Sequence, residues 1–320
     1  MKKRINRILI LNNSIKPCGV QQWGARLINV VNKSTTYEYL YREVSSSGET
    51  ISAIVDINPS IVLYNYNPST MPFIKKNILG MFPNIKHVAM VHEGYLHTDN
   101  FVGFKYFIYL LGKFDGLDPE ILNRVFVLPI RYLLKYDGGY PVNKVPTIGS
   151  FGFGFPSKRF DYIVDQVNKE FDVADIKFAI SNSYHGDRDG SSAEAVIKTC
   201  REKITKPGIN LYVNREFLTD EEVLEFLAGN DINCFFYDTR KTDAVASSTE
   251  FALSVKRPMA ITRVSMFYNI YTIVPSICIE DTSIKDILER GTEPLEPLYK
   301  AFSDENFLFE FEKIIKVING

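Results

Sequence analysis

The sequence is poor in cysteine, histidine, tryptophan and net charge. Its 320 residues include 4 Cys, 4 His and 1 Trp, and the formal net charge is −1, from 37 basic and 38 acidic residues. Cys18, Cys200, Cys234 and Cys278 lie far apart, without the close pairs of a zinc ribbon or a disulfide framework. This spacing favours a reduced, cytoplasmic protein. The balance of charge gives no strong signal for a nucleic-acid partner.

Long apolar runs are also missing. No run of about twenty apolar residues occurs, so we expect no transmembrane segment, which leaves peripheral membrane contact open. The basic start of the chain precedes an apolar stretch of only Ile8–Leu11, which is too short for the core of a signal peptide. The stretch predicts a first buried strand instead.

Short apolar strands and amphipathic helices alternate along both halves of the chain, as in doubly wound parallel sheets. Strands are expected at 7–11, 61–66, 87–92, 125–130, 146–150, 177–180, 209–213, 232–237 and 259–262. Helices are expected at 23–31, 51–57, 73–81, 160–170, 191–203, 219–228, 248–255 and 303–317. Thr219 is expected to cap its helix, with Glu222 completing a capping box. The fold class is therefore α/β, with two doubly wound Rossmann-like domains.

Length and composition predict where these domains lie. A chain of 320 residues exceeds one ordinary core. The glycine-rich stretch Tyr136–Lys144 is the best linker candidate. We expect an N-terminal domain over 1–143, a C-terminal domain over 144–302, and a helix over 303–320 that can pack back on the first domain. Ligands of such sheets bind at the carboxyl ends of the strands, so we expect a central cleft there.

A glycine-rich loop is the most informative feature. Between Thr147 and Asp161 a strand leads through Gly152 and Phe153 to the basic pair Lys158-Arg159 and a helix start. Glycine lets backbone approach an anion, and basic side chains and helix N-termini attract one. The loop therefore predicts a phosphorylated ligand, although such glycines also occur for packing alone.

Three further loops are expected to reach the cleft. Gly19 opens a turn that is followed by Gln21 and Gln22, where a sugar hydroxyl or oxyanion could bind. His92 and Glu93 end a strand at the usual position of catalytic groups. The run Ser247-Ser248-Thr249-Glu250 begins a helix and could bind phosphate, although it also suits an ordinary N-cap.

Other chemistries find less support. Asp187 and Asp189 could hold Mg²⁺ at a diphosphate, but aspartate is also a common turn former, and we expect no bound metal and no cofactor. A Gly-x-Ser-x-Gly nucleophile elbow and a dinucleotide fingerprint are both missing from the sequence.

The segment Thr147–Thr262 resembles the C-terminal domain of GT-B glycosyltransferases, especially the family 4-like group. The similarity is carried by Gly149–Asp161, by Phe217–Val223 and by Ser247–Thr262, and more loosely by Cys18–Gln21 and Val91–Glu93. The sequence departs from the family's pattern at the helix that contains Glu250. The family often has two Glu separated by seven residues there, whereas Glu250 stands alone. Lys256-Arg257 also replaces the family's glycine before Pro258.

The resemblance implies a glycosyltransferase that moves a hexosyl group from a nucleoside-diphosphate sugar to a glycan or other hydroxyl acceptor, retaining and metal-independent, in polysaccharide biosynthesis. It implies donor binding by Gly152, Phe153, Lys158, Arg159 and the run Ser247, Ser248, Thr249 and Glu250. Catalytic positions near the transferring sugar would be His92 and Glu93. The domain over 1–143 would be the acceptor side, and the domain over 144–302 would bind the nucleotide sugar. The acceptor-side loop would be Gly19, Gln21 and Gln22.

Two rival interpretations stay open. The same fold without transfer activity would be a nucleotide-sugar-binding protein or a sugar-nucleotide epimerase, and the single Glu250 is its best support. A nucleic-acid base glucosyltransferase would need a basic rim on the cleft. Lys75-Lys76 and the basic N-terminus are better explained as solvated surface.

Overall fold

The chain forms two compact units. The structure, a computed structural model, describes residues 7–16, 18–92, 101, 103–110, 122–128, 131–183, 186–238 and 245–320. The first unit comprises residues 1–130, 242–245 and 304–320, and the second comprises 131–241 and 246–303. Residues 131–143, which the sequence analysis assigns to the first domain and in part to the linker, cluster with the second unit.

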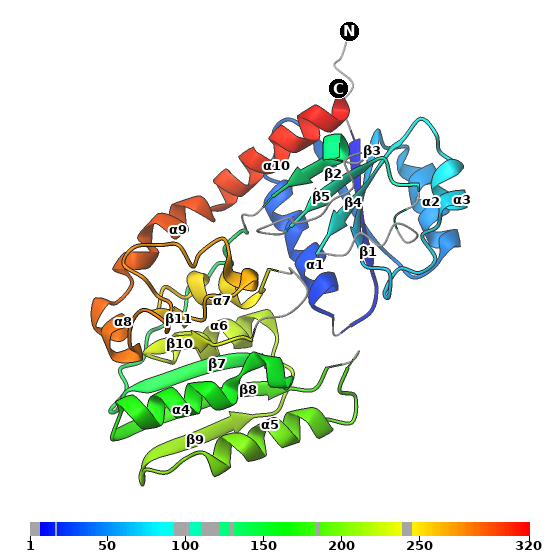
Figure 1. Cartoon of the computed structure of the whole chain (residues 1–320). Helices are drawn as coiled ribbons and strands as arrows, with labels where there is room; N and C mark the ends of the chain where they lie inside the picture. Colours follow the sequence, from blue (N-terminus) through cyan, green and yellow to red (C-terminus); the bar gives the residue numbers. More distant parts are fainter. Residues whose placement is uncertain are drawn as a thin grey trace. The chain divides into compact units, whose positions relative to one another are not determined.

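The first unit contains a 6-stranded parallel sheet in the order β2-β1-β3-β4-β5-β6 (Figure 1). Its strands are β1 (Arg7–Asn13), β2 (Glu38–Val44), β3 (Ile61–Tyr66), β4 (Lys86–Val91), β5 (Tyr106–Tyr109) and β6 (Val125–Val127). Apolar periodicity does not predict β2, because this edge strand carries polar and charged side chains instead of a continuous apolar run. Strand β5 was not predicted either.

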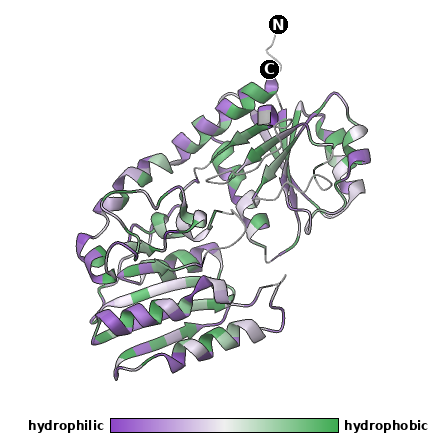
Figure 2. Ribbon diagram, in the orientation of Figure 1, coloured by the Kyte–Doolittle hydropathy of each residue, from purple (hydrophilic) through white to green (hydrophobic). Residues whose placement is uncertain are grey.

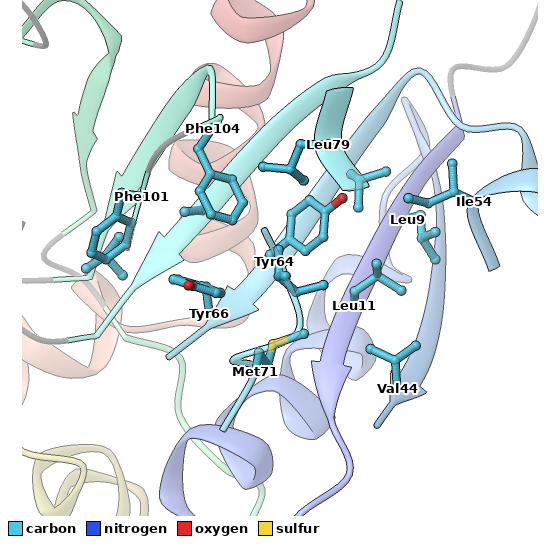
Figure 3. Packing of buried hydrophobic residues seen from close by; sticks show 14 of the residues in the cluster. Leu9, Leu11, Val44, Ile54, Tyr64, Tyr66, Met71, Leu79, Phe101 and Phe104 are labelled. Carbon is cyan, nitrogen blue, oxygen red and sulfur yellow. The ribbon is translucent and has the colours of Figure 1, made fainter. Parts of the chain in front are cut away.

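Helices α1 (Gly19–Val31), α2 (Ser47–Ile57) and α3 (Lys76–Gly80) connect these strands. Helix α2 begins earlier than its apolar pattern suggests, because the Ser46 side chain accepts a hydrogen bond from the Glu49 amide. Apolar side chains from the helices and the sheet form a core that includes Leu11, Ile54 and Tyr64 (Figure 3). Apolar residues follow the strands of both sheets in Figure 2, as expected for sheets buried on two faces.

The C-terminal helix α10 (Asp304–Asn319) belongs to the first unit. The Phe311 ring packs 6.3 Å from the ring of Tyr39 on β2, measured between centroids. The Lys86 ammonium donates a hydrogen bond of 2.7 Å to the carbonyl of Ile318. This lysine supplies a donor to the carbonyl end of the helix, where cations are favourable.

The second unit contains a 5-stranded parallel sheet in the order β11-β10-β7-β8-β9. The strands are β7 (Thr147–Phe153), β8 (Val173–Ser181), β9 (Gly208–Asn214), β10 (Ile232–Phe235) and β11 (Met259–Ile261). The helices are α4 (Phe160–Glu170), α5 (Ser191–Glu202), α6 (Asp220–Ala228), α7 (Ser248–Ser254), α8 (Ile284–Arg290) and α9 (Glu296–Ala301). The predicted capping box of Thr219 and Glu222 is confirmed. The predicted class, two doubly wound α/β units, is confirmed as well.

Each sheet has one point where the direction of chain winding reverses. In the first unit, β1 is followed by β2 on one side and by β3 on the other. In the second unit, β7 leads outward to β8 and β9, whereas β10 returns to the opposite side of β7. Adjacent loops separate at such a switch point, leaving a crevice at the carboxyl ends of the strands where ligands bind.

Candidate functional site

Lys158 lies at the switch point of the second unit. The loop after β7 places its ammonium group 3.7 Å from the ring centroid of Tyr237, which follows β10. The Tyr237 hydroxyl donates a 3.1 Å hydrogen bond to the hydroxyl of Ser248, the first residue of α7. One cation, one buried aromatic ring and one helix start are therefore joined at the crevice. Such a group can attract an anion.

Two glycines of the loop have different roles. A Cβ at Gly154 would come within 2.3 Å of Ala193, so this glycine is required for packing against α5. At Gly152, by contrast, the φ of +149° disfavours other residues, yet a Cβ would meet only the Lys158 side chain, at 3.9 Å. The backbone at Gly152 is thus open on the side of Lys158, and a ligand could approach it closely.

Most of the backbone donors in the loop are already occupied. The amide of Gly154 donates to the Ser181 carbonyl at 3.1 Å, and that of Phe155 to Phe153 at 2.8 Å. The amides of Lys158 and Arg159 donate to carbonyls within the short helical turn Pro156–Lys158 and its flank. The anion-binding capacity of this loop therefore resides mainly in the Lys158 side chain, whereas the sequence suggested that the glycine backbone would contribute as well.

Arg159 forms an ion pair within its own loop and helix. Its guanidinium contacts the Asp161 carboxylate at 3.2 Å, and Lys203 binds the same carboxylate at 2.9 Å. Burial raises the pKa of Asp161, but the hydrogen bond from Lys203 and the charge of Arg159 outweigh it and lower the pKa overall. Arg159 lines a cavity of about 460 Å³ together with Pro156 and residues of α5, whereas Lys158 does not line it. The sequence suggested one basic pair, and the structure separates its two members.

The run from Ser247 to Glu250 is mostly buried. Ser247 is exposed, whereas the side chains of Ser248, Thr249 and Glu250 are enclosed. The Thr249 hydroxyl has no hydrogen-bond partner within the described part of the chain. The Glu250 carboxylate lies 3.9 Å from the Arg131 guanidinium. Of the four expected donor-binding side chains here, only that of Ser247 faces solvent.

The two aspartates weighed as metal ligands cap α5. The Asp187 carboxylate accepts hydrogen bonds from the amides of Ser192, at 2.8 Å, and Ala193, at 3.0 Å. Asp189 accepts one from the Ser191 amide at 3.2 Å. Within the residues that the structure describes, no group of three or more His, Cys, Asp or Glu is arranged to hold a metal ion.

Aromatic rings gather at the same edge of the second sheet. Phe153, at the end of β7, stacks on Phe217, which follows β9, with centroids 6.3 Å apart and planes inclined by 24°. Phe217 is 40% exposed, so one part of this cluster remains accessible. An exposed aromatic face suits stacking with a planar ligand such as a nucleobase.

The first unit places polar side chains at its own switch point. Asn65, on β3, donates hydrogen bonds to the side-chain oxygen of Asn12 on β1, at 2.8 Å, and to the Val20 carbonyl, at 2.6 Å. Its amide oxygen lies 2.5 Å from His92 Nε2, directly after β4. Because the Asn65 nitrogen donates twice, its oxygen is the acceptor, and His92 Nε2 carries the proton. The Trp23 ring packs edge-on against His92 with centroids 5.0 Å apart.

The acceptor-side residues divide between surface and core. Gly19 is exposed at the start of α1, and Gln22 is half-buried. Gln21 is buried, and its side-chain amide donates a 2.7 Å hydrogen bond to Glu43. Gln21 therefore holds α1 on the sheet. Glu93, the second catalytic residue expected from the sequence, lies outside the described residues.

Sequence reasoning missed Asn12, Asn65, Tyr237 and Arg131. The first three end or follow strands that were predicted, so strand-end position was a usable signal for them. Arg131 lies in an extended segment without motif or periodicity, and nothing in the sequence marks it.

Comparison with known proteins gives structural matches only. No protein-family model matches the chain, and no curated protein gives a significant match. The described helices include none with the length and apolar character needed to cross a membrane.

Solved structures match nearly the whole chain at low sequence identity. The lipopolysaccharide outer core galactosyltransferase WaaB, in its apo form, is 10% identical with a TM-score of 0.65, over 97% of this chain and 99% of that one. OtsA in its apo form is 9% identical with a TM-score of 0.70, over 98% and 99%. Anabaena HepE in complex with UDP and glucose is 11% identical with a TM-score of 0.63, over 97% and 99%. The chain therefore has the fold of the GT-B glycosyltransferases.

Proposed function

We propose that this protein is a glycosyltransferase that moves a sugar from a nucleoside-diphosphate sugar to a hydroxyl acceptor. The observation that carries the proposal is the position of Lys158 above Tyr237, at the switch point of the second sheet. The similar HepE structure contains UDP and glucose, which supports a uridine diphosphate donor as the first candidate. A glycan is the acceptor class that the family 4-like resemblance favours.

Lys158 would stabilise the leaving group. As the bond from sugar to phosphate breaks, negative charge grows on the distal phosphate, and a positioned cation lowers the barrier. The ring of Tyr237 holds the ammonium at the crevice, so little reorganisation is needed when the donor binds. Because Lys158 supplies this charge, we propose that transfer proceeds without a divalent metal.

Neighbouring groups would bind the rest of the donor. Gly152 would let a phosphate approach the open backbone, and Phe217 would stack on the nucleobase. Ser247 is the exposed residue at the start of α7 and would contact a phosphate oxygen. Arg159 is already paired with Asp161, which makes it a weaker candidate for donor binding.

In the first unit, His92 would serve the transferring sugar. Asn65 fixes the tautomer of its ring, and Trp23 limits its rotation. A held imidazole can hydrogen-bond a sugar hydroxyl. We further propose that the reaction retains the anomeric configuration, as the resemblance implies; the anomeric proton signal of the first product, measured by NMR, tests this point.

Nucleotide binding and transfer are tested separately. A thermal-shift screen with UDP, GDP, ADP and their sugar conjugates, in EDTA and then in Mg²⁺, should raise the unfolding midpoint for one diphosphate family without metal. Release of nucleoside diphosphate from the selected sugar conjugate, in the presence of candidate acceptors, then measures transfer. Absence of any shift would contradict the proposal. Binding without release would favour a non-catalytic nucleotide-sugar-binding protein.

A further inference from the structure

A buried ion pair connects the start of the second unit to α7. The Arg131 guanidinium lies 3.9 Å from the Glu250 carboxylate, with side-chain exposures of 4% and 0%. Glu250 belongs to the first turn of α7, and Arg131 is the first residue of the second unit. The two opposite charges attract each other where both side chains are buried, so each residue constrains the position of the other.

The segment that follows Arg131 also contacts the last turn of the same helix. The Leu134 amide donates a 2.8 Å hydrogen bond to the Ser254 hydroxyl, and that hydroxyl donates to the Glu250 carbonyl at 2.5 Å. The extended segment is itself anchored, because the Leu133 amide donates to the Phe302 carbonyl at 3.0 Å. Residues 131–134 therefore hold α7 near both of its ends.

The first turn of α7 is in turn joined to the Lys158 site. Ser248, two residues before Glu250, accepts the hydrogen bond from Tyr237, whose ring carries the Lys158 ammonium. A shift of this turn would move the Ser248 hydroxyl and so disturb the ring beneath the lysine. The contacts from Arg131 to Lys158 are continuous, and each one joins described residues of the second unit.

We propose that Arg131 is a positioning residue of the donor site: by pairing with Glu250 it sets the first turn of α7, and through Ser248 and Tyr237 the place of Lys158. This inference rests on the proposed function for the identity of the ligand. It assigns a role to a residue that lies outside every recognised motif of the sequence. The role is conformational, since Arg131 is buried and acts through Glu250.

A double-mutant cycle on UDP affinity tests the assignment. The variants are Arg131→Met, Glu250→Gln and the neutral pair with both changes, with Arg131→Lys as the conservative variant. We expect Arg131→Met to weaken UDP binding about twofold to threefold, because its effect passes through the bond between Ser248 and Tyr237, and we expect the neutral pair to bind no more weakly than Glu250→Gln alone. Arg131→Lys should recover part of the loss. If the loss of UDP affinity in the neutral pair equals the product of the losses in the two single variants, Arg131 acts independently of Glu250, and the inference is overturned.

Stability and local exchange separate this inference from the proposed function. Arg131→Met should lower the unfolding midpoint by on the order of 5–10 °C, and the neutral pair should recover most of that shift. Amide hydrogen exchange in 248–254 should accelerate in Arg131→Met relative to α4, measured without ligand. If the wild-type protein binds no nucleoside diphosphate, the proposed function fails, and the exchange result still decides the role of Arg131. Unchanged exchange in 248–254 would overturn that role.

Discussion

The ammonium group of Lys158 lies 3.7 Å from the ring centroid of Tyr237. The two residues follow different strands, β7 and β10, and meet where the winding of the sheet reverses. The ring is buried, so the cation contacts a low-dielectric surface while its position remains at the carboxyl edge of the sheet. A cation held in this way is available to an incoming anion.

Replacing Lys158 by Ala should weaken UDP binding by about tenfold or more, because a charge-assisted hydrogen bond to a phosphate is lost. Isothermal titration calorimetry measures the affinity. Lys169→Ala is the matched control, since it removes an exposed lysine from the far end of α4. Equal affinities for the two variants would contradict the role of Lys158.

Two substitutions at Tyr237 separate its ring from its hydroxyl. Tyr237→Phe keeps the ring beneath Lys158 and loses only the bond to Ser248, so UDP affinity should fall less than threefold, with a stability loss of about 1 kcal/mol. Tyr237→Leu also removes the cation–π contact and should weaken UDP binding about fivefold or more. The two affinities and the urea unfolding curves are measured together. A loss of affinity that is the same in both variants would show that the ring does not position the lysine.

His92→Ala should reduce the rate of transfer about a hundredfold while changing UDP affinity less than twofold, because the lost imidazole serves the sugar and not the diphosphate. Initial rates at saturating donor, together with calorimetry, check this separation. Asn65→Ala frees the ring of His92 without removing it and should give a smaller rate loss. A His92 variant with the wild-type rate would exclude His92 from the reaction.

His87 should make the protein less stable in mild acid. Burial lowers the pKa of His87 from its ordinary 6.5, and the ring contacts the Tyr64 hydroxyl at 2.9 Å and the Phe82 carbonyl at 3.2 Å. At pH values between the lowered pKa and about 6.5, the unfolded chain binds more protons than the folded chain. The contribution of His87 to stability is therefore complete above about pH 6.5 and is lost as the pH falls below 6.5 towards the lowered pKa.

Urea unfolding of the wild type and of His87→Gln, at pH 7.5 and pH 5.5, tests this dependence. The drop in unfolding free energy between the two pH values should be smaller in His87→Gln, because the variant has no imidazole to protonate. An identical drop in both proteins would assign the acid sensitivity to other groups.

Gly24 should not tolerate a methyl group. A Cβ there would lie 2.4 Å from the side-chain nitrogen Nδ2 of Asn65 and 2.8 Å from Cγ of Asn12. Both side chains are buried under α1 and are hydrogen-bonded to each other. Gly24→Ala should therefore lower stability by about 1–3 kcal/mol. Gly80→Ala is the control, since its Cβ would meet nothing within 4 Å. Chemical unfolding of both variants gives the comparison, and an unaffected Gly24→Ala would contradict the tight approach of α1.

Much of the fold could be read from local pattern. The strand Ile61–Tyr66 and the helix Phe160–Glu170 were predicted with the bounds that the structure has, because both carry strong apolar periodicity. The capping box at Thr219 followed from two residue types at the right spacing. Edge strand β2 did not follow, because the exposed charged residues Arg42 and Glu43 interrupt its apolar pattern.

The site was less predictable than the fold. The loop that contains Gly152 and Lys158 was recognisable, since its residue types and order suit an anion. Its partner Tyr237 was not recognised, and neither was the pairing of Arg159 with Asp161, because such contacts depend on which strands become neighbours.

The sequence alone determined the α/β class, most of the succession of strands and helices, and the loop that carries Lys158, since each of these depends on local spacing and residue type. Only the tertiary structure decided that Lys158 lies on Tyr237, that Arg159 points to a different partner, and that Arg131 meets Glu250. These contacts join residues far apart in the chain. They are brought together by the order of the strands in the sheet and by burial, and neither can be predicted from a short stretch of sequence.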